Sequence, residues 1–285
     1  MIVYLNGEWL PAAEAKIPID DRGFLYGDGV YETARLYRGG YFRFHAHYRR
    51  LAAGAEALRI PVPPEEELAS IARELARRNG LEEGSLRITL TRGRGGRGLG
   101  TAGAVSPTLL ATLQPMAQDW REQVERGWYL VTATHTRHPP PDLLPLQLKS
   151  LGRIHAILAR LEAEAAGADD ALLLSPDGAV AEGPTWNIFW REGDDLYTPA
   201  PEVGALEGVT RAVVLELADE LGLTVHVGRW PRSRLDAAEE IFLTMTSLGL
   251  VPVARLDERT FPEHARRAFQ TLRPRYWERV EQEVR

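Results

Sequence analysis

The stretch Leu146-Gln147-Leu148-Lys149-Ser150-Leu151 places a lysine among aliphatic side chains. Two of the 34 basic residues are lysines, Lys149 and Lys16, and all the others are arginines. A guanidinium stays charged at any working pH, whereas a primary amine can lose its proton and form a Schiff base with a carbonyl group. We therefore interpret Lys149 as a candidate nucleophile, with a plain surface lysine as the alternative, and Lys16 as a surface residue.

The composition limits the class of protein. The chain has 285 residues, enough for one large domain or two modest ones, and it contains no cysteine, which excludes disulfides, thiolate metal sites and a cysteine nucleophile. A formal net charge of −6 argues against a general polyanion binder. No apolar run approaches the ~20 residues that cross a bilayer, and the first residues do not resemble a signal peptide. We expect a cytoplasmic protein without a membrane span.

The first part of the chain alternates strand and helix signals. We expect strands at residues 2–5, 86–91 and 108–113, a hairpin across residues 31–44, and helices at about residues 47–58 and 65–78. In the second helix, Leu68, Ile71, Ala72 and Leu75 share one face, and Gly80 ends it. These signals predict a small α/β domain over residues 1–113. Residues 114–127 show no clear period and are interpreted as an interdomain linker.

Residues 128–285 are predicted to form the larger domain. We expect strands at residues 129–134, 171–174, 179–182, 188–190, 196–198, 223–227 and 241–246, and helices at about residues 210–221 and from residue 262. Lys149 lies where a proline-rich loop is expected to meet a further helix, which Gly167 ends. The apolar stripe of that helix consists of Leu151, Ile154, Ile157, Leu158 and Leu161. The fold class is therefore α/β (α+β) with two domains.

Two segments after Lys149 carry polar groups of chemical interest. Glu182 follows the apolar residues Val180-Ala181 and precedes Gly183, so it is interpreted as a carboxylate embedded in an apolar strand end. The alternative is a plain strand-edge glutamate, because charged residues are rarely buried unless they are paired. Residues 206–211 place a glycine and Thr210 at the start of a helix. Free amides at a helix N-terminus bind phosphate, whereas a threonine there can also be a simple N-cap.

A glycine-rich segment, Thr91-Arg92-Gly93-Arg94-Gly95-Gly96-Arg97-Gly98-Leu99-Gly100, lies between two expected strands. This segment could be an RGG segment that binds nucleic acid, a solvated hairpin tip, or a loop that binds an anionic small molecule. The segment occurs once in an acidic protein, so a loop that presents arginine to an anionic small molecule fits better. None of the seven histidines has a partner at metal-ligand spacing, and no metal site is expected.

Taken in order, these segments resemble the fold-type IV pyridoxal-phosphate enzymes, the class IV aminotransferase family. That family includes D-amino-acid transaminase, branched-chain aminotransferase and aminodeoxychorismate lyase. The similar segments are residues 21–32, 47–51, 149–151, 182–189, 206–211 and 251–253. The resemblance implies the two-domain fold of D-amino-acid aminotransferase, and a homodimer with active sites near its interface.

The resemblance also implies how pyridoxal 5′-phosphate is bound. Lys149 would form the Schiff base with the cofactor and then act as general base and acid. Glu182 would face the pyridine nitrogen and keep it protonated. Arg50, rather than its neighbour Arg49, aligns with the phosphate-binding arginine of the family. The further cofactor-binding residues would be Asn187, Leu206, Val209, Thr210 and Thr246.

The residues implied in substrate binding are Tyr31, Thr33, Arg97, Leu99 and Ser247. Tyr31 and Arg97 match two carboxylate ligands of D-amino-acid transaminases, while Leu99 stands where those enzymes have a histidine. We therefore predict an aminotransferase that exchanges an amino group between an α-amino acid of D configuration and a 2-oxo acid. Thr33 and the glycine-rich segment look like aminodeoxychorismate lyase, which releases pyruvate and is the first alternative. An (R)-amine transaminase or a branched-chain aminotransferase follows.

Overall fold

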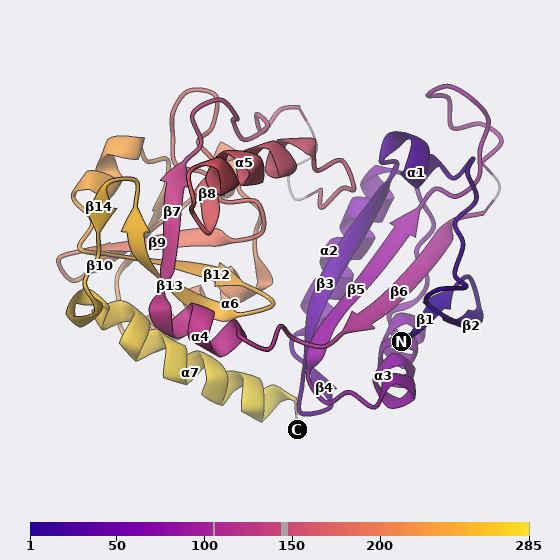
Figure 1. Cartoon of the computed structure of the whole chain (residues 1–285), viewed down its shortest axis with the longest axis horizontal. Coiled ribbons are helices and arrows are strands. Elements are labelled where there is room, and N and C mark those ends of the chain that lie inside the picture. The colour runs from indigo at the N-terminus through magenta and orange to yellow at the C-terminus, as the bar shows by residue number, and fades with distance from the viewer. Residues whose placement is uncertain (105, 144–147, 285) are drawn as a thin grey trace. The chain divides into compact units, whose positions relative to one another are not determined.

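The computed structural model describes residues 1–104, 106–143 and 148–284, which divide into two compact units (Figure 1). The first unit contains Met1–Met116, Leu148–Gly152 and the C-terminal residues from Val280. The second unit takes in the rest of the chain between Ala117 and Arg279. The segment around Lys149 thus groups with the first unit.

The first unit is built on a six-stranded antiparallel sheet with the strand order β2-β1-β6-β5-β3-β4. Its strands are β1 (Ile2–Leu5), β2 (Glu8–Pro11), β3 (Gly29–Tyr37), β4 (Gly40–Tyr41), β5 (Gly84–Thr91) and β6 (Thr108–Gln114). Its helices are α1 (Arg22–Tyr26), α2 (Phe44–Ala57) and α3 (Glu65–Asn79). Helices α2 and α3 pack on one face of the sheet and form the core with it.

Strands β3 and β5 separate the core side chains from the side chains on the other face. Alternate residues of the two strands enter the core, namely Val30, Ala34, Leu36, Leu86, Ile88 and Leu90. The residues between them point away from the helices, because successive side chains of a strand lie on opposite faces. On that second face Tyr31 is paired with Thr89, and Thr33 with Arg87.

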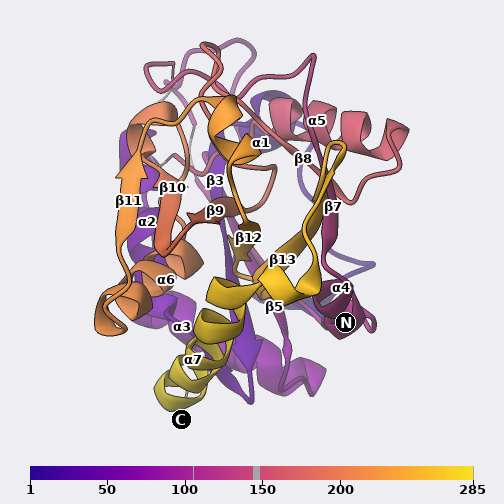
Figure 2. The same ribbon diagram turned by 90° about the vertical axis from the view of Figure 1, so that its left-hand side faces the viewer.

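The second unit contains an eight-stranded sheet with the order β11-β10-β9-β12-β13-β7-β8, and β14 pairs with β13. In Figure 2 these strands follow one another from β11 on the left to β7 on the right. The strands are β7 (Trp128–Thr132), β8 (Asp170–Leu172), β9 (Asn187–Glu192), β10 (Asp195–Pro199), β11 (Val225–Gly228), β12 (Glu240–Met245), β13 (Gly249–Leu256) and β14 (Arg259–Thr260). Its helices are α4 (Trp120–Arg126), α5 (Ile154–Ala165), α6 (Val209–Glu220) and α7 (Arg267–Glu283), with short 3-10 turns at Pro201–Val203, Arg232–Asp236 and Glu263–Ala265.

Several elements differ from those expected. Strands β2, β13 and β14 and the short helix α1 were not predicted, and α4 lies in the segment interpreted as a linker. Helix α4 buries Trp120 and Val124, which are one turn apart, but it is too short for a period to show. The strand expected at residues 179–182 is absent, since Val180 contributes only an isolated bridge to Leu174.

Helix α5 does not bury its aliphatic stripe. Of the five residues predicted to form the stripe, Leu151 precedes the helix and the other four are 48 to 67% exposed. The buried residues of α5 are Ala156, Ala159 and Ala163, and the last two pack on Ala171 and Leu173. Small side chains let a helix axis approach its neighbour closely, so the alanine face packs inward. Four large aliphatic side chains remain on the surface of this chain.

No helix in the described part of the chain is long and apolar enough to cross a membrane. The cytoplasmic location stays a prediction from the sequence.

Candidate active site

The backbone of Lys149 is attached to the edge of strand β3. Tyr31 N–H donates to the carbonyl oxygen of Lys149 at 3.0 Å, and Leu151 N–H donates to that of Gly29 at 3.0 Å. Between these bonds, Val30 and Ser150 form an antiparallel bridge. Lys149 therefore lies on an extended segment, and not at the start of a helix as expected, because α5 begins only at Ile154.

The amine of Lys149 shares the ring of Tyr31 with a second cation. Lys149 Nζ is 4.9 Å from the ring centroid, and the guanidinium carbon of Arg87 is 3.9 Å from it. Arg87 is exposed, and among the described residues it forms no ion pair. The sequence interpretation missed Arg87. The alternation of apolar and polar residues over positions 86–90 could have placed Arg87 on the same face of the sheet as Tyr31. It could not have shown that Arg87 contacts the ring of Tyr31.

Arg50 lies inside the first unit, on helix α2. Its Nε and Nη2 donate to the two carboxylate oxygens of Glu32 at 2.6 and 3.0 Å, and His47 Nδ1 lies 2.9 Å from Glu32 Oε2. Burial alone would raise the pKa of Glu32, but the positive charge of Arg50 and the hydrogen bonds from His47 and Arg50 lower it to about 2. Burial lowers the pKa of His47. The neighbouring Arg49 is exposed.

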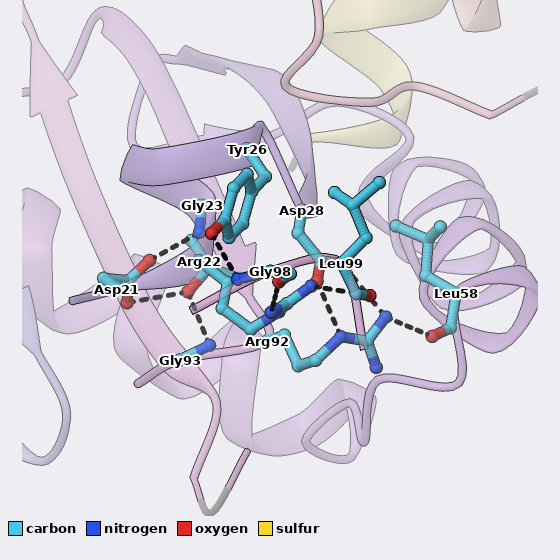
Figure 3. A network of polar contacts seen from close by, with 11 residues as sticks. Asp21, Arg22, Gly23, Tyr26, Asp28, Leu58, Arg92, Gly93, Gly98 and Leu99 are labelled. Atoms are coloured by element: carbon cyan, nitrogen blue, oxygen red, sulfur yellow. Dashed lines mark hydrogen bonds and ion pairs between the residues drawn. The ribbon is translucent and has the colours of Figure 1, made fainter. Parts of the chain in front are cut away.

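Arg22 holds the backbone of the glycine-rich loop (Figure 3). Its Nη1 and Nη2 donate to the carbonyl oxygens of Gly98 and Leu99 at 2.9 and 3.3 Å, and its Nε donates to Asp28 at 2.8 Å. Gly98 N–H in turn donates to the hydroxyl oxygen of Tyr26 at 3.0 Å. The segment at residues 21–28, which resembles the N-terminal signature of the family, thereby determines where this loop lies.

Arg92 anchors the beginning of the same loop. It donates to both carboxylate oxygens of Asp28, at 2.7 and 3.0 Å, and to the carbonyl oxygen of Leu58 at 2.8 Å. The side chains of Arg97 and Leu99 are exposed, and Arg97 has no hydrogen bond or ion pair within the described residues. The loop backbone is fixed, while the guanidinium of Arg97 extends from it.

In the second unit, three predicted cofactor residues meet at one carboxylate. Glu182 is buried, and its Oε2 accepts hydrogen bonds from Leu206 N–H at 2.8 Å and from Asn187 Nδ2 at 3.0 Å. Its Oε1 lies 3.3 Å from His138 Nε2. His138 was not predicted, because it lies 44 residues before Glu182 and no local pattern connects the two.

Helix α6 begins with Val209 and Thr210, and both are buried. Gly208 is the N-cap residue and supplies no side-chain hydrogen bond, so the first amides of the helix are available to an anion. A Cβ atom on Gly208 would lie 2.0 Å from Asn187 Oδ1, which explains the glycine. Thr246 and Ser247 lie in the turn that connects β12 to β13.

Both units contain groups that suit pyridoxal phosphate. The first carries Tyr31, Thr33, Arg50, Arg97, Leu99 and Lys149, and the second carries Glu182, Asn187, Leu206, Val209, Thr210, Thr246 and Ser247. A primary amine can bond to the aldehyde, helix amides and a guanidinium suit the phosphate, and a buried carboxylate suits a protonated ring nitrogen. The donor set therefore fits this cofactor.

A family model described as amino-transferase class IV matches residues 29–256. A putative branched-chain-amino-acid aminotransferase of Methanocaldococcus jannaschii is 36% identical over 260 residues, 91% of this chain and 89% of the relative. A D-alanine aminotransferase of Bacillus licheniformis is 32% identical over 261 residues, 91% of this chain and 90% of the relative. A T.th. branched-chain amino acid aminotransferase, solved with N-(5′-phosphopyridoxyl)-L-glutamate, has a TM-score of 0.86 at 31% identity, and the match covers 98% of this chain and 94% of the other.

The chain therefore belongs to the class IV aminotransferase family. It is a pyridoxal-phosphate-dependent aminotransferase with the fold-type IV architecture. The family, the fold class and the cofactor expected from the sequence are confirmed. The preference for D-amino acids is not, and the branched-chain alternative has the better support, since the branched-chain relative is 36% identical and the D-alanine relative 32%.

Replacing Glu32 tests the buried ion pair on α2. Because its folded pKa of about 2 lies below the ordinary value of 4.5, Glu32 stabilises the fold above pH 4.5 and loses this effect as the pH falls towards 2. We expect Glu32→Gln to lower the free energy of unfolding by on the order of 3 kcal/mol at pH 7, and by less at lower pH. Urea denaturation of the cofactor-free protein at several pH values measures the difference.

The matched control is Glu56→Gln, on the exposed side of the same helix. It should change the free energy of unfolding by less than about 0.5 kcal/mol. Equal effects of the two variants, or an effect of Glu32→Gln that grows on acidification, would contradict the ion-pair interpretation.

Proposed function

We propose that this aminotransferase exchanges amino groups between aliphatic α-amino acids, branched-chain ones first, and 2-oxo acids. One observation carries the choice of an α-amino acid over a simple amine: Lys149 and Arg87 approach the same ring of Tyr31, at 4.9 and 3.9 Å. A substrate bound there meets an amine and a guanidinium, and the guanidinium suits a carboxylate. The aliphatic side chain is supported by the relatives named above.

Arg87 is proposed as the principal ligand of the substrate carboxylate. It projects from strand β5 opposite Thr33, so its distance from Lys149 is set by the sheet. Arg97, which the resemblance assigns to this role, extends from a loop as a second cation. Tyr31 would contribute its hydroxyl to the same carboxylate.

Each predicted cofactor residue has a proposed task. Bound pyridoxal phosphate supplies a protonated ring that takes up electron density from the substrate. Lys149 would hold the cofactor through its aldehyde, and Lys149 Nζ, once free, would carry the proton between the substrate Cα and the former aldehyde carbon. Glu182 holds the proton on the pyridine nitrogen, with Asn187 and the amide of Leu206 keeping its carboxylate in place. The groups that would bind the phosphate are Arg50, the first amides of α6 at Val209 and Thr210, and the hydroxyl of Thr246. Leu206 would contact the cofactor ring, and Ser247 would contact the substrate.

A D-amino-acid aminotransferase is the second candidate. The glycine-rich loop supports it, because Arg22 donates to the carbonyl oxygen of Gly98 and the hydroxyl oxygen of Tyr26 accepts from Gly98 N–H, and these bonds hold the residue that follows Arg97 in place. The D-alanine aminotransferase of Bacillus licheniformis supports it as well, at 32% identity.

A substrate panel distinguishes the candidates. L-leucine, L-valine, D-alanine, (R)-1-phenylethylamine and aminodeoxychorismate are each mixed with the holoenzyme, and the loss of the visible band of the cofactor is followed by stopped flow. We expect the branched-chain L-amino acids to react fastest. Faster reaction with D-alanine would replace the first candidate by the second, and release of pyruvate from aminodeoxychorismate would overturn both.

An Arg87→Gln variant tests the carboxylate ligand. Losing a charge-assisted hydrogen-bonded pair should lower kcat/KM for the preferred amino acid on the order of 100-fold. Reaction with an amine that lacks a carboxylate should not fall. The control is Arg94→Gln on the glycine-rich loop, where Arg94 pairs only with the exposed Asp20 among the described residues. Equal kcat/KM in Arg87→Gln and wild type would remove the proposed role.

We also propose a homodimer that uses the exposed stripe of α5. The side chains of Ile154, Ile157, Leu158 and Leu161 lie together on one face of the helix and are 48 to 67% exposed. Contiguous exposed aliphatic groups of this kind are typical of an interface. The resemblance to dimeric enzymes with active sites near the interface supports a second copy of the chain as the partner.

Replacing one residue of this stripe should weaken the dimer. A buried glutamate lacks a partner in an apolar interface, so Leu158→Glu should shift the sedimentation mass towards that of one chain. Ala165→Glu, at the exposed end of the same helix, should leave the mass unchanged. A monomeric wild type would contradict the dimer, and a dimeric Leu158→Glu variant would contradict its placement on α5.

A further inference from the structure

Both ring nitrogens of His138 face hydrogen-bond acceptors. Nδ1 lies 2.9 Å from the carbonyl oxygen of Pro139, and Nε2 lies 3.3 Å from Glu182 Oε1. A carbonyl oxygen and an ionised carboxylate can only accept, so each nitrogen must carry a proton to form its bond. Turning the ring over would place carbon atoms against both acceptors. His138 can donate from both nitrogens at once only as an imidazolium.

The surroundings hold this ring in place. His138 is buried, and its backbone N–H donates to the carbonyl oxygen of Leu174 at 2.8 Å. Gly204 adopts a φ of +100°, and a Cβ atom there would lie 2.8 Å from His138 Nδ1. The glycine therefore provides the space that the ring fills, and the ring cannot easily move away from Glu182.

The pKa of a second histidine, His155, which lies next to His138, is shifted in the opposite direction. The rings of His138 and His155 are 5.9 Å apart between centroids. Burial and the positive charges of Arg153 and His138 lower the pKa of His155 to about 4. Burial and Arg153 also act against a charge on His138, but its hydrogen bond to Glu182 and the charge of Glu182 outweigh them and raise its pKa. Within the pair, the pKa of His138 is thus raised and the pKa of His155 is lowered.

The carboxylate of Glu182 has room for one more donor. An ionised carboxylate offers about four acceptor positions. The amide of Leu206, the side-chain amide of Asn187 and the imidazolium of His138 occupy three of them. The position that is left is on Oε1, the oxygen that His138 contacts. A ligand that donates to Glu182 therefore shares an oxygen atom with His138.

We propose that His138 is a positioning residue whose positive charge beside Glu182 moderates how tightly Glu182 holds the proton of the pyridine nitrogen. The proposal rests on the role given to Glu182 above, and not on the identity of the substrate. Two donors that share one oxygen compete for its charge, so a cationic His138 weakens the hold of Glu182 on the pyridinium. Removing the charge but keeping a donor should strengthen that hold.

The first experiment needs no cofactor. In the cofactor-free protein, the nitrogen-15 resonances of His138, assigned by their loss in His138→Gln, should both have imidazolium values at pH 7. They should titrate above the pH at which His155 titrates. A neutral His138 at pH 7 would overturn the proposal. The variant serves only to assign the resonances, and the protonation state is measured on the wild-type protein.

The folding equilibrium gives a second readout. The pKa of His138 is raised on folding, so its stabilising effect is complete below the ordinary value of 6.5 and is lost as the pH rises through the folded pKa. The difference in urea midpoint between wild type and His138→Gln should therefore shrink with rising pH. His155→Gln is the matched control, because the pKa of His155 is shifted the other way. A difference that grows with pH would overturn the proposal.

The third experiment uses holoenzyme with nitrogen-15 at the ring nitrogen of pyridoxal phosphate. In His138→Gln, the pH at which this nitrogen loses its proton should rise by about one unit or more, as expected for removal of a nearby like charge. His155→Gln should leave it unchanged. A Glu182→Gln variant separates the two proposals: if it does not change the nitrogen resonance, the role of Glu182 fails. If it does and His138→Gln does not, only the inference about His138 fails.

Discussion

Two backbone hydrogen bonds between β3 and the segment around Lys149 determine where the reactive amine lies. They join Tyr31 to Lys149 and Leu151 to Gly29, on either side of the bridge between Val30 and Ser150. Because adjacent strands lie about 5 Å apart, this pairing places the Lys149 side chain within reach of whatever β3 presents on the same face. The ring of Tyr31, and through it Arg87 on the next strand, is thereby part of one fixed arrangement with the amine.

The buried carboxylates of Glu32 and Glu182, of which only Glu182 was predicted for the site, have different hydrogen-bond partners. Glu32 accepts hydrogen bonds from two nitrogens of Arg50, from His47 and from Thr33 N–H, which fill its acceptor positions, and it holds Arg50 in helix α2. In Glu182, Oε2 accepts hydrogen bonds from two neutral amides, and Oε1 contacts His138. Burying a carboxylate is costly unless its acceptor positions are filled, and Glu182 has one position left for a ligand. Glu32 is therefore interpreted as a structural carboxylate, whereas Glu182 can accept a further hydrogen bond from a cofactor.

Secondary structure could be predicted from the sequence where a hydrophobic period runs over many consecutive residues. Helix α3 and strand β5 follow their hydrophobic periods closely, and the motif order around Lys149 predicted the family and the cofactor. The buried face of α5 could not be predicted, because alanines and larger aliphatic residues lie on opposite sides of the helix, and periodicity does not show which apolar face is buried. Arg87 and His138 were missed for another reason: each acts through a contact across strands or between distant loops, which depends on register and packing.

In the first unit, the candidate site residues divide between a paired sheet and an anchored loop. Lys149, Tyr31 and Arg87 are connected through strand pairing, so a change of substrate side chain or configuration has little means to move them. Arg97 lies on a loop whose backbone is held by Arg22, while its own side chain extends freely among the described residues. Enzymes that share the first arrangement and differ in the loop would share the chemistry and differ in substrate. A branched-chain and a D-alanine aminotransferase at 36 and 32% identity are consistent with that division.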